Sequence, residues 1–372
     1  MKKIIFSLIV TGLLVSCSHN STKPSVEPLA VSTSVGREDM QRRLLKKLAL
    51  QTIVPLYQQF YEHTALLNNN ISSFCLTPNQ QYFNQVRNSW AQTVSAWLRA
   101  DALLFGPAIE EQLDFFIYFY PAKKRIINKL LNGQETITAE LVAQAGVGGQ
   151  GLATMEYLLF ERNLSSEEIL QNYQGQNGKQ RCQYLGATAF LLQQHAKTIY
   201  DAWRPEQGNY AEAISRAGLD SLIYTEIQQP WAELINKIFQ SAEKISSNRL
   251  ALALGKKTES QPKPYKLEAW RSGHTLANIQ ASLQGLRRLF DGGLLDWLKQ
   301  NGHQITAENL THTMADFDQE KLLHTDLFHL LQTNPDAIDP FYKKSKVLTR
   351  IIKHDFAKAM GVQLGFNDND GD

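Results

Sequence analysis

The stretch GLATMEYLLF, residues 151–160, places a single carboxylate within an otherwise uncharged helical pattern. Helical spacing puts Glu156 on one face with residues three and four positions away, none of them charged: Leu152, Ala153, Leu159 and Phe160. Removing a carboxylate from water is costly unless hydrogen-bond donors or an opposite charge compensate it. The sequence therefore predicts that Glu156 faces a polar partner from another part of the chain.

Helical patterns extend over most of the chain, and β-strand alternation is almost absent. One helix is expected from Thr77-Pro78, as N-cap and first helical residue, to Phe105, where Gly106-Pro107 ends it. Another begins near Gly151. Apolar residues at helical spacing predict further helices over residues 39–68, 120–131, 179–203, 219–248, 267–290, 307–331 and 346–360.

A polar segment, ERNLSSEEILQNYQGQNGK at residues 161–179, separates these patterns into two groups. Amphipathic helices of this length bury their apolar stripes against one another. We therefore expect an all-α fold of two helical bundle domains packed together. The predicted bundles span residues 39–165 and 166–366, and an acidic tail follows at residues 367–372.

The first 17 residues combine a charged start, an apolar stretch too short to span a bilayer comfortably, and the sequence Leu14-Val15-Ser16-Cys17. This resembles a bacterial lipoprotein signal peptide whose lipobox ends in Cys17, with cleavage before Cys17 and a lipid on its sulfur. An ordinary secretory peptide with a chance cysteine is the alternative. Residues 18–38, rich in Ser, Thr and Pro, predict a flexible tether.

The lipobox predicts a protein lipid-anchored in the periplasm. Ser18 stands where a retention signal would place Asp, which favours the inner leaflet of the outer membrane. Without Lys2 and Lys3 the chain has 36 basic and 36 acidic residues, so nucleic acid is not an expected partner.

Two cysteines, Cys75 and Cys182, are left once Cys17 carries the lipid. In an oxidising periplasm they either form one disulfide or lie separately buried as thiols, and the sequence does not choose between these arrangements. A structural zinc site is not indicated, because closely spaced Cys and His pairs are missing.

Two further polar groups lie on apolar stripes. Asp101 shares a helical stripe with Trp90 and Trp97, although it could also lie at the edge of that stripe and meet water or Arg99. The apolar seam that ends at Phe290 continues backward, on the same helical face, into a polar set: Glu268, Arg271, Ser272 and Thr275.

Buried charges are best compensated by one another or by a ligand, so we expect these side chains to converge. The predicted pocket brings Glu156 and Asp101 together with Glu268, Arg271 and Ser272. His274 lies at its edge, and a lone His in such a position is more often hydrogen-bonded than a metal ligand.

Four motifs in this order resemble those of the imelysin-like periplasmic lipoproteins, which include an insulin-cleaving membrane protease and iron-regulated proteins. The motifs are Trp90 and Trp97 leading into Leu104 to Pro107, then residues 151–160, then Glu268 to Gly273, and finally Leu364 to Asn367 with the acidic tail. The resemblance covers nearly the whole chain beyond the tether. It implies two all-α bundle-like domains around a shared central site and an association with bacterial iron acquisition. For some members it also implies a disputed metallopeptidase activity.

The family signature Gly-x-His-x-x-Glu is incomplete in this chain. Gly151 and Glu156 occupy its outer positions, but Ala153 stands where the His would be. The His-Glu-x-x-His helix of zinc peptidases is also missing from the sequence. Both departures disfavour peptidase activity, and no catalytic residue is assigned.

We therefore expect a binding component in iron or other metal uptake that uses a polar inter-helix site. Its expected partners are the membrane, through the lipid, iron or an iron chelate, and uptake-system proteins. Glu156 is the candidate ligand of iron or another divalent cation, whereas Arg271 would oppose a cation and favour an anionic, carboxylate-bearing iron chelate. The alternatives are a metallopeptidase and a protein-docking scaffold. The ligand-binding residues are predicted to be Asp101, Glu156, Glu268, Arg271, Ser272 and His274.

Overall fold

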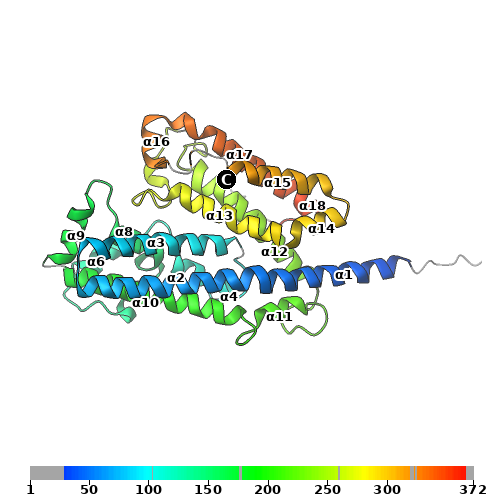
Figure 1. The fold of residues 1–372 in the computed structure, drawn as a ribbon, viewed down its shortest axis with the longest axis horizontal. Coiled ribbons are helices and arrows are strands. Elements are labelled where there is room, and N and C mark those ends of the chain that lie inside the picture. Colours follow the sequence, from blue (N-terminus) through cyan, green and yellow to red (C-terminus); the bar gives the residue numbers. More distant parts are fainter. Residues whose placement is uncertain are drawn as a thin grey trace, which may run out of the picture.

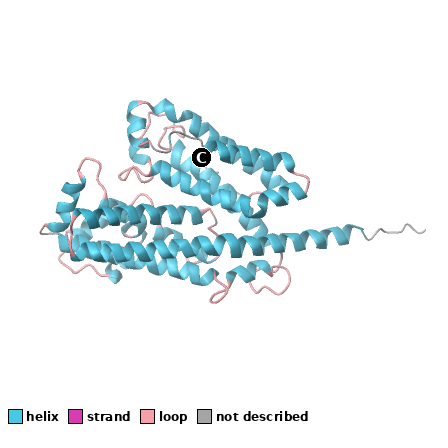
Figure 2. Ribbon diagram, in the orientation of Figure 1, coloured by secondary structure: helices cyan, strands magenta, loops and turns pink. Residues whose placement is uncertain are grey.

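The computed structural model describes residues 29–365 except 103, 176–177, 259, 319–321 and 323–324, with side chains from residue 36 onward. Every regular element in this part of the chain is a helix, which confirms the all-α prediction (Figure 2). The predicted signal peptide with Cys17, the first part of the tether and the tail at 367–372 lie outside the described residues.

The first body of the molecule is built on one long helix. α1 (Leu29–Leu48), the π-helical η1 (Ala49–Ile53) and α2 (Val54–Leu76) follow one another without a break (Figure 1). Thus helix begins at Leu29, within the predicted tether. α3 (Gln80–Asp101) and α10 (Gly178–Trp203) both pack along α2.

Shorter helices complete the first body. α8, which carries Glu156, lies between α3 and α10. The segment 161–179, predicted as a polar break, contains a helix that starts with a capping box between Ser165 and Glu168. The shorter elements are α4 (Pro107–Glu110), α5 (Leu113–Ile117), α6 (Lys124–Leu131), α7 (Ala139–Gln144), η2 (Val147–Gly149), α8 (Gly151–Leu159), α9 (Ser166–Gln174) and α11 (Tyr210–Ser215).

The second body lies above the first in Figure 1 and touches it mainly where α13 packs on α3. It begins with α12 (Gln228–Glu243), η3 (Lys244–Ala251) and η4 (Pro264–Lys266). The remaining elements are α13 (Thr275–Leu289), η5 (Phe290–Leu294), α14 (Leu295–Gln300), α15 (Gln304–Asp318), α16 (Leu327–Thr333), η7 (Pro335–Ile338), α17 (Asp339–Arg350), η8 (Ile351–Phe356) and α18 (Ala357–Ala359).

Four predicted helices, α3, α6, α12 and α13, start later than the sequence suggested, and the last two differ most. α13 begins at Thr275 and not at 267, because Ala269 (φ 55°) and Gly273 (φ 74°) adopt left-handed backbone conformations that a helix cannot contain. Residues 219–227 form a loop before α12. At the start of α3, Asn79 caps the helix in place of Thr77 by accepting from the Tyr82 amide.

A disulfide joins Cys75 at the end of α2 to Cys182 on α10, with Cα atoms 5.5 Å apart. The sequence left open whether these cysteines form a disulfide or stay separate thiols, and the structure contains the disulfide. α10 follows residue 165 in the chain yet packs on α2, so the disulfide holds segments from both sides of the predicted 165/166 boundary together.

None of the described helices combines the length and apolar content that crossing a membrane requires.

The two bodies approach each other closely at Gly285 of α13. A Cβ atom at this position would lie 2.2 Å from the carbonyl oxygen of Arg99 on α3, so only glycine allows this helix approach. We predict that Gly285→Ala lowers the free energy of unfolding by about 1–3 kcal/mol, because the obstructing atom belongs to the backbone and cannot rotate away.

Gly186→Ala is the matched control, since a Cβ on this glycine of α10 meets no atom within 4 Å. There the change should be neutral or stabilising by about 0.4–1 kcal/mol. Urea unfolding of both variants, with the disulfide intact, makes the comparison. Equal stability of the two variants would contradict the predicted close contact.

Candidate functional site

Glu156 is buried on α8, with 1% of its surface exposed, and its partner comes from the other body. Its Oε1 atom accepts two hydrogen bonds from Ser272, one from the backbone amide at 2.9 Å and one from the hydroxyl at 3.0 Å. Ser272 lies in the turn between η4 and α13. The predicted polar partner of Glu156 is therefore this turn.

Burial raises the pKa of Glu156 to about 7, whereas the Ser272 donors and the Arg271 charge act in the opposite direction. Burial is the larger effect because desolvation penalises the charged form of a carboxyl group. Glu156 thus changes its protonation state near neutral pH.

Arg271 is held rigidly but is not fully paired. Its guanidinium lies over the Trp270 ring, 4.1 Å from the centroid, and 5.1 Å from the centroid of Tyr157. Its Nε atom is 4.0 Å from Glu161, and only 9% of the side chain is exposed. Among the described residues, neither Nε nor Nη2 has a hydrogen-bond partner. Two buried donors of Arg271 are therefore unsatisfied in the described part of the chain.

Arg271 and Ser272 line an open cavity of about 460 Å³, here called the Arg271 pocket. Arg162 and Asp326, which form an ion pair across the two bodies, lie at its wall together with Arg87. Arg162 also donates to the Trp270 carbonyl at 2.6 Å, which fixes the turn beside the pocket. The lining carries three arginines against two carboxylates, Glu161 and Asp326, so a net positive charge remains that favours an anion.

His274 also lines the Arg271 pocket, but its ring is hydrogen-bonded and packed within the protein. Its Nδ1 atom is 3.0 Å from the Ser272 carbonyl oxygen, and its ring meets Trp90 edge-on. Burial, helped by the Arg87 charge, lowers the pKa of His274. The imidazole is therefore neutral at pH 7 and hydrogen-bonded within the turn.

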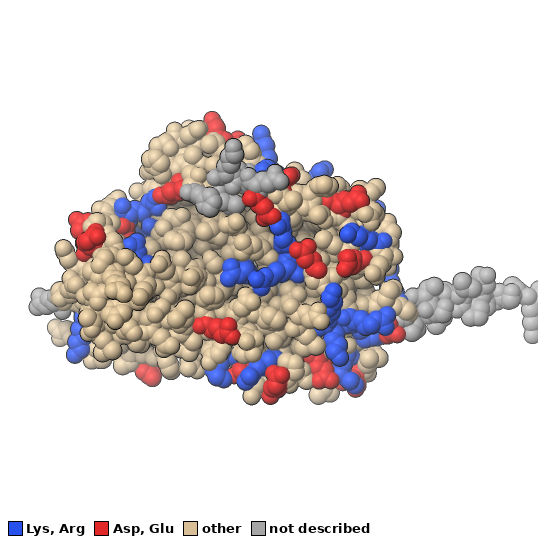
Figure 3. Space-filling view, viewed as in Figure 1, with Lys and Arg blue, Asp and Glu red and all other residues tan. Residues whose placement is uncertain are grey.

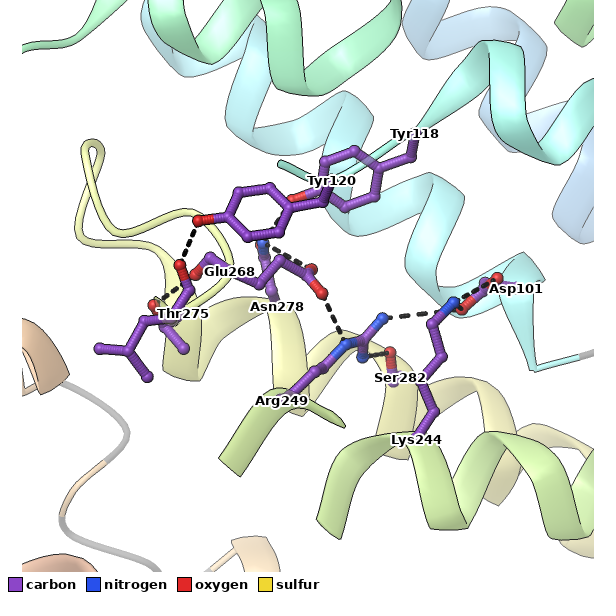
Figure 4. A network of polar contacts seen from close by, with 10 residues as sticks. Asp101, Tyr118, Tyr120, Lys244, Arg249, Glu268, Thr275, Asn278 and Ser282 are labelled. Atoms are coloured by element: carbon purple, nitrogen blue, oxygen red, sulfur yellow. Dashed lines mark hydrogen bonds and ion pairs between the residues drawn. The ribbon is translucent and has the colours of Figure 1, made fainter. Parts of the chain in front are cut away.

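Asp101 belongs to a second cluster, shown in Figure 4. Its Oδ2 atom lies 3.0 Å from Lys244 Nζ and 3.6 Å from Arg249 Nη2. Arg249 also donates from Nε to Glu268 at 2.8 Å and from Nη1 to Ser282 at 2.5 Å. Asp101 comes from the first body and the other members from the second, so this network ties the two bodies together.

Tyr118 and Tyr120 lie beside this second cluster (Figure 4). Asn278 donates to the Tyr118 hydroxyl at 3.4 Å, and the Tyr120 hydroxyl donates to the carbonyl of Leu267. Burial raises the pKa of both tyrosines, and the charges of Glu156 and Glu268 raise it further. Both hydroxyls therefore stay protonated.

The structure divides the predicted single pocket into two parts. Glu156, Arg271, Ser272 and His274 lie together, whereas Asp101 and Glu268 are compensated by Arg249 and Lys244. Sequence reasoning missed Arg249, although it continues the buried stripe of its helix at spacings of three and four: Trp231, Ile235, Ile238, Ala242 and Ile245.

The donor set around Glu156 does not fit a bound cation. In the described part of the chain, His, Cys, Asp and Glu side chains do not gather in groups of three or more that could hold a metal ion. Glu156 is occupied by donors from Ser272, and Arg271 adds a positive charge nearby. Hard cations prefer several oxygen ligands, and these residues do not supply them.

We predict that Glu156→Gln alters the pH dependence of stability. The pKa of Glu156 rises from 4.5 to about 7 on folding, so between these values the folded state holds the extra proton. Stability contributed by protonated Glu156 is then lost as pH rises from 4.5 to 7, by a total of about 3 kcal/mol. Glu156→Gln should remove this loss, which urea unfolding at several pH values measures.

Glu167→Gln, at an exposed carboxylate on α9, is the control and should keep the wild-type pH profile. A profile for Glu156→Gln that parallels wild type would show that Glu156 does not titrate in this range.

Comparisons with known proteins agree with this architecture. A search of curated proteins finds no match. A solved imelysin-like protein from Psychrobacter arcticum 273-4 is 20% identical with a TM-score of 0.72, covering 88% of this chain and 98% of that one. A solved protein from Parabacteroides distasonis ATCC 8503, described as an iron-regulated protein A precursor, is 15% identical with a TM-score of 0.68, covering 87% and 95%. At these identities the likeness establishes the fold.

The family model described as Peptidase_M75, Imelysin, matches residues 53–335, from the end of η1 to the start of η7. The match includes Glu156, the turn with Arg271 and Ser272, and the Arg249 network, so both halves of the site lie within it. The chain belongs to the imelysin family.

Proposed function

We propose that this protein is a lipid-anchored periplasmic binding component of bacterial iron acquisition, and that its ligand is an anionic, carboxylate-bearing iron chelate bound in the Arg271 pocket. The proposal rests on the buried, incompletely hydrogen-bonded guanidinium of Arg271. The side chain is nine-tenths buried and its guanidinium contacts the rings of Trp270 and Tyr157, yet two of its nitrogen atoms have no hydrogen-bond partner in the described structure.

An anion suits this pocket better than a free cation. Asp326 pairs with Arg162 at the wall, so the positive charge of Arg87 and Arg271 is what would oppose a metal ion. A guanidinium presents a planar pair of donors that matches a carboxylate, and stacking on Trp270 keeps that plane fixed. Iron would then enter as part of the chelate, with its own ligands already in place.

The link to iron rests on family relationships. The structural neighbour from Parabacteroides distasonis is described as iron-regulated, and the sequence resemblance points to the same process. Peptidase activity, which the family description names, is not proposed because Ala153 replaces the motif His. A docking scaffold would require no inward polar site, whereas Glu156 and Arg271 form one.

We predict that Arg271→Met weakens ferric citrate binding at least tenfold, since a buried, charge-assisted pair with a carboxylate is lost while the stacking volume is kept. Isothermal titration calorimetry at pH 7 with ferric citrate, citrate alone and iron alone provides the measurement. Citrate alone should bind detectably to the wild type, because the pocket recognises the carboxylates.

Arg125→Met, at an exposed arginine on α6 outside the pocket, is the control and should bind as the wild type does. Tight binding of iron alone that survives Arg271→Met would exclude the anionic-chelate proposal and point back to Glu156 as a metal ligand.

The anchor gives a separate prediction. In cells fed labelled palmitate, the wild type should incorporate the label, and Cys17→Ser should abolish incorporation because the acceptor sulfur is gone. Ser18→Ala leaves the lipobox intact and should keep the label. Equal labelling of Cys17→Ser and wild type would refute the lipoprotein assignment while leaving the pocket untouched.

A further inference from the structure

The loop between α11 and α12, residues 216–227, exposes three large apolar side chains at its tip. Leu219, Leu222 and Ile223 are 66%, 102% and 50% exposed, respectively. Single exposed leucines are common on protein surfaces, but several together in one short loop mark an interaction surface. The Arg271 pocket does not involve this loop.

The base of the loop keeps its tip in water. The Gly218 amide donates to the Tyr224 carbonyl at 3.2 Å, which closes the loop just below the apolar residues. Ala217 and Tyr224 are buried, and the Tyr224 hydroxyl donates to Glu233 at 2.6 Å. With both ends fixed, the tip cannot turn inward to bury its side chains.

The loop is also fixed beside α1. Arg42 donates from Nη1 to the Ala217 carbonyl at 3.4 Å, and Gln228 donates to Gln41 at 3.2 Å. In Figure 1 the loop lies near the end of the body from which α1 extends. Residues 18–28 connect α1 to the proposed lipid-bearing Cys17. A fully extended chain spans at most about 3.5 Å per residue, so this connection is at most about 40 Å long.

The charges on α1 complement an anionic surface. The helix carries five basic residues and only two acidic ones, Glu38 and Asp39, both of which pair with Arg42. Within the loop, Asp220 pairs with Arg216, and Glu226 near its end is a second exposed carboxylate. Figure 3 shows basic side chains at this end of the molecule, with acidic ones among them. The basic residues of α1 are Arg37, Arg42, Arg43, Lys46 and Lys47.

We propose that the loop 216–227 and the exposed basic residues of α1 form a docking surface for a phospholipid bilayer containing anionic headgroups. Leu219, Leu222 and Ile223 insert among the headgroups, and the exposed side chains of Arg43, Lys46 and Lys47 contact the lipid phosphates. Insertion of a few apolar side chains together with basic residues is the usual composition of a reversible membrane-binding surface. A lipid at Cys17 would add to this contact and orient the Arg271 pocket relative to the bilayer.

The experiment uses the mature chain without its lipid, residues 18–372 exported behind an ordinary secretory signal. Because Cys75 and Cys182 are bonded to each other, Leu222→Cys introduces the reactive thiol at which an environment-sensitive dye can be attached. On vesicles of 70% phosphatidylethanolamine and 30% phosphatidylglycerol, we expect blue-shifted emission about twofold brighter, because the tip enters a less polar medium. Leu164→Cys, exposed beside α9 at the opposite end of the first body, should show no change.

Co-sedimentation with the same vesicles supplies the second readout. The combined variant Leu219→Ser, Leu222→Ser and Ile223→Ser should bind about tenfold more weakly or worse, whereas Leu164→Ser should bind as wild type does. Unchanged circular dichroism checks that both variants fold. Vesicle binding that the combined variant retains in full would overturn the proposal.

Unchanged emission from the dye at position 222 when vesicles are added would also overturn the proposal. Loss of a dimer in the combined variant, seen by sedimentation velocity without any vesicle binding, would assign the loop to a second copy of the chain instead. Because the tested chain has no lipid, none of these results depends on whether Cys17 is modified or what the Arg271 pocket binds.

Discussion

The Glu156 carboxylate has no donor on its own face of α8, so its burial depends on hydrogen bonds from the second body. Ser272 supplies both, and it can do so only because the turn before α13 brings its amide and hydroxyl to the same oxygen. That turn requires left-handed conformations at Ala269 and Gly273. The same turn places Arg271 on the Trp270 ring. Compensation of one buried carboxylate thus positions the two bodies, the turn and the pocket together.

The two polar clusters have different roles because their charges are balanced differently. Around Arg249, two carboxylates balance two basic groups across the interface, and Ser282 accepts a further hydrogen bond from Arg249. Among the Arg249 nitrogen atoms only Nη2, 3.6 Å from Asp101, lacks a hydrogen-bond partner within the described residues. Removing one member of such a buried set leaves an uncompensated charge, so this cluster stabilises the interface. Arg271 has no such balance, since its nearest carboxylate is 4.0 Å away and partly exposed. An unsatisfied, rigid donor set is typical of a binding site.

Helical periodicity could predict which side chains point inward, but not which of them meet. It identified Glu156 and Asp101, and the same reasoning extended along α12 would have identified Arg249. It then treated residues 268–275 as helix, because nothing in their composition reveals a positive φ at Ala269, a residue that rarely adopts one. Thus it assigned Arg271 and Glu268 to one face, whereas the turn sends them to different clusters. Conversely, the helix within residues 161–179 could have been predicted from its Ser-x-x-Glu capping box. The polar composition of this segment led to its interpretation as a break between bundles.

Glu156 and the proposed ligand are linked through charge. The Arg271 charge lowers the pKa of Glu156, and burial raises it to about 7. An anion bound to Arg271 would neutralise that charge and add a negative one nearby, and both changes favour the protonated carboxyl group. Anion binding therefore draws a proton onto Glu156, and by reciprocity a protonated Glu156 favours the anion. With Ala153 in place of a motif histidine, the proposed function would make Glu156 a proton-coupled neighbour of the ligand and Arg271 the group that binds it.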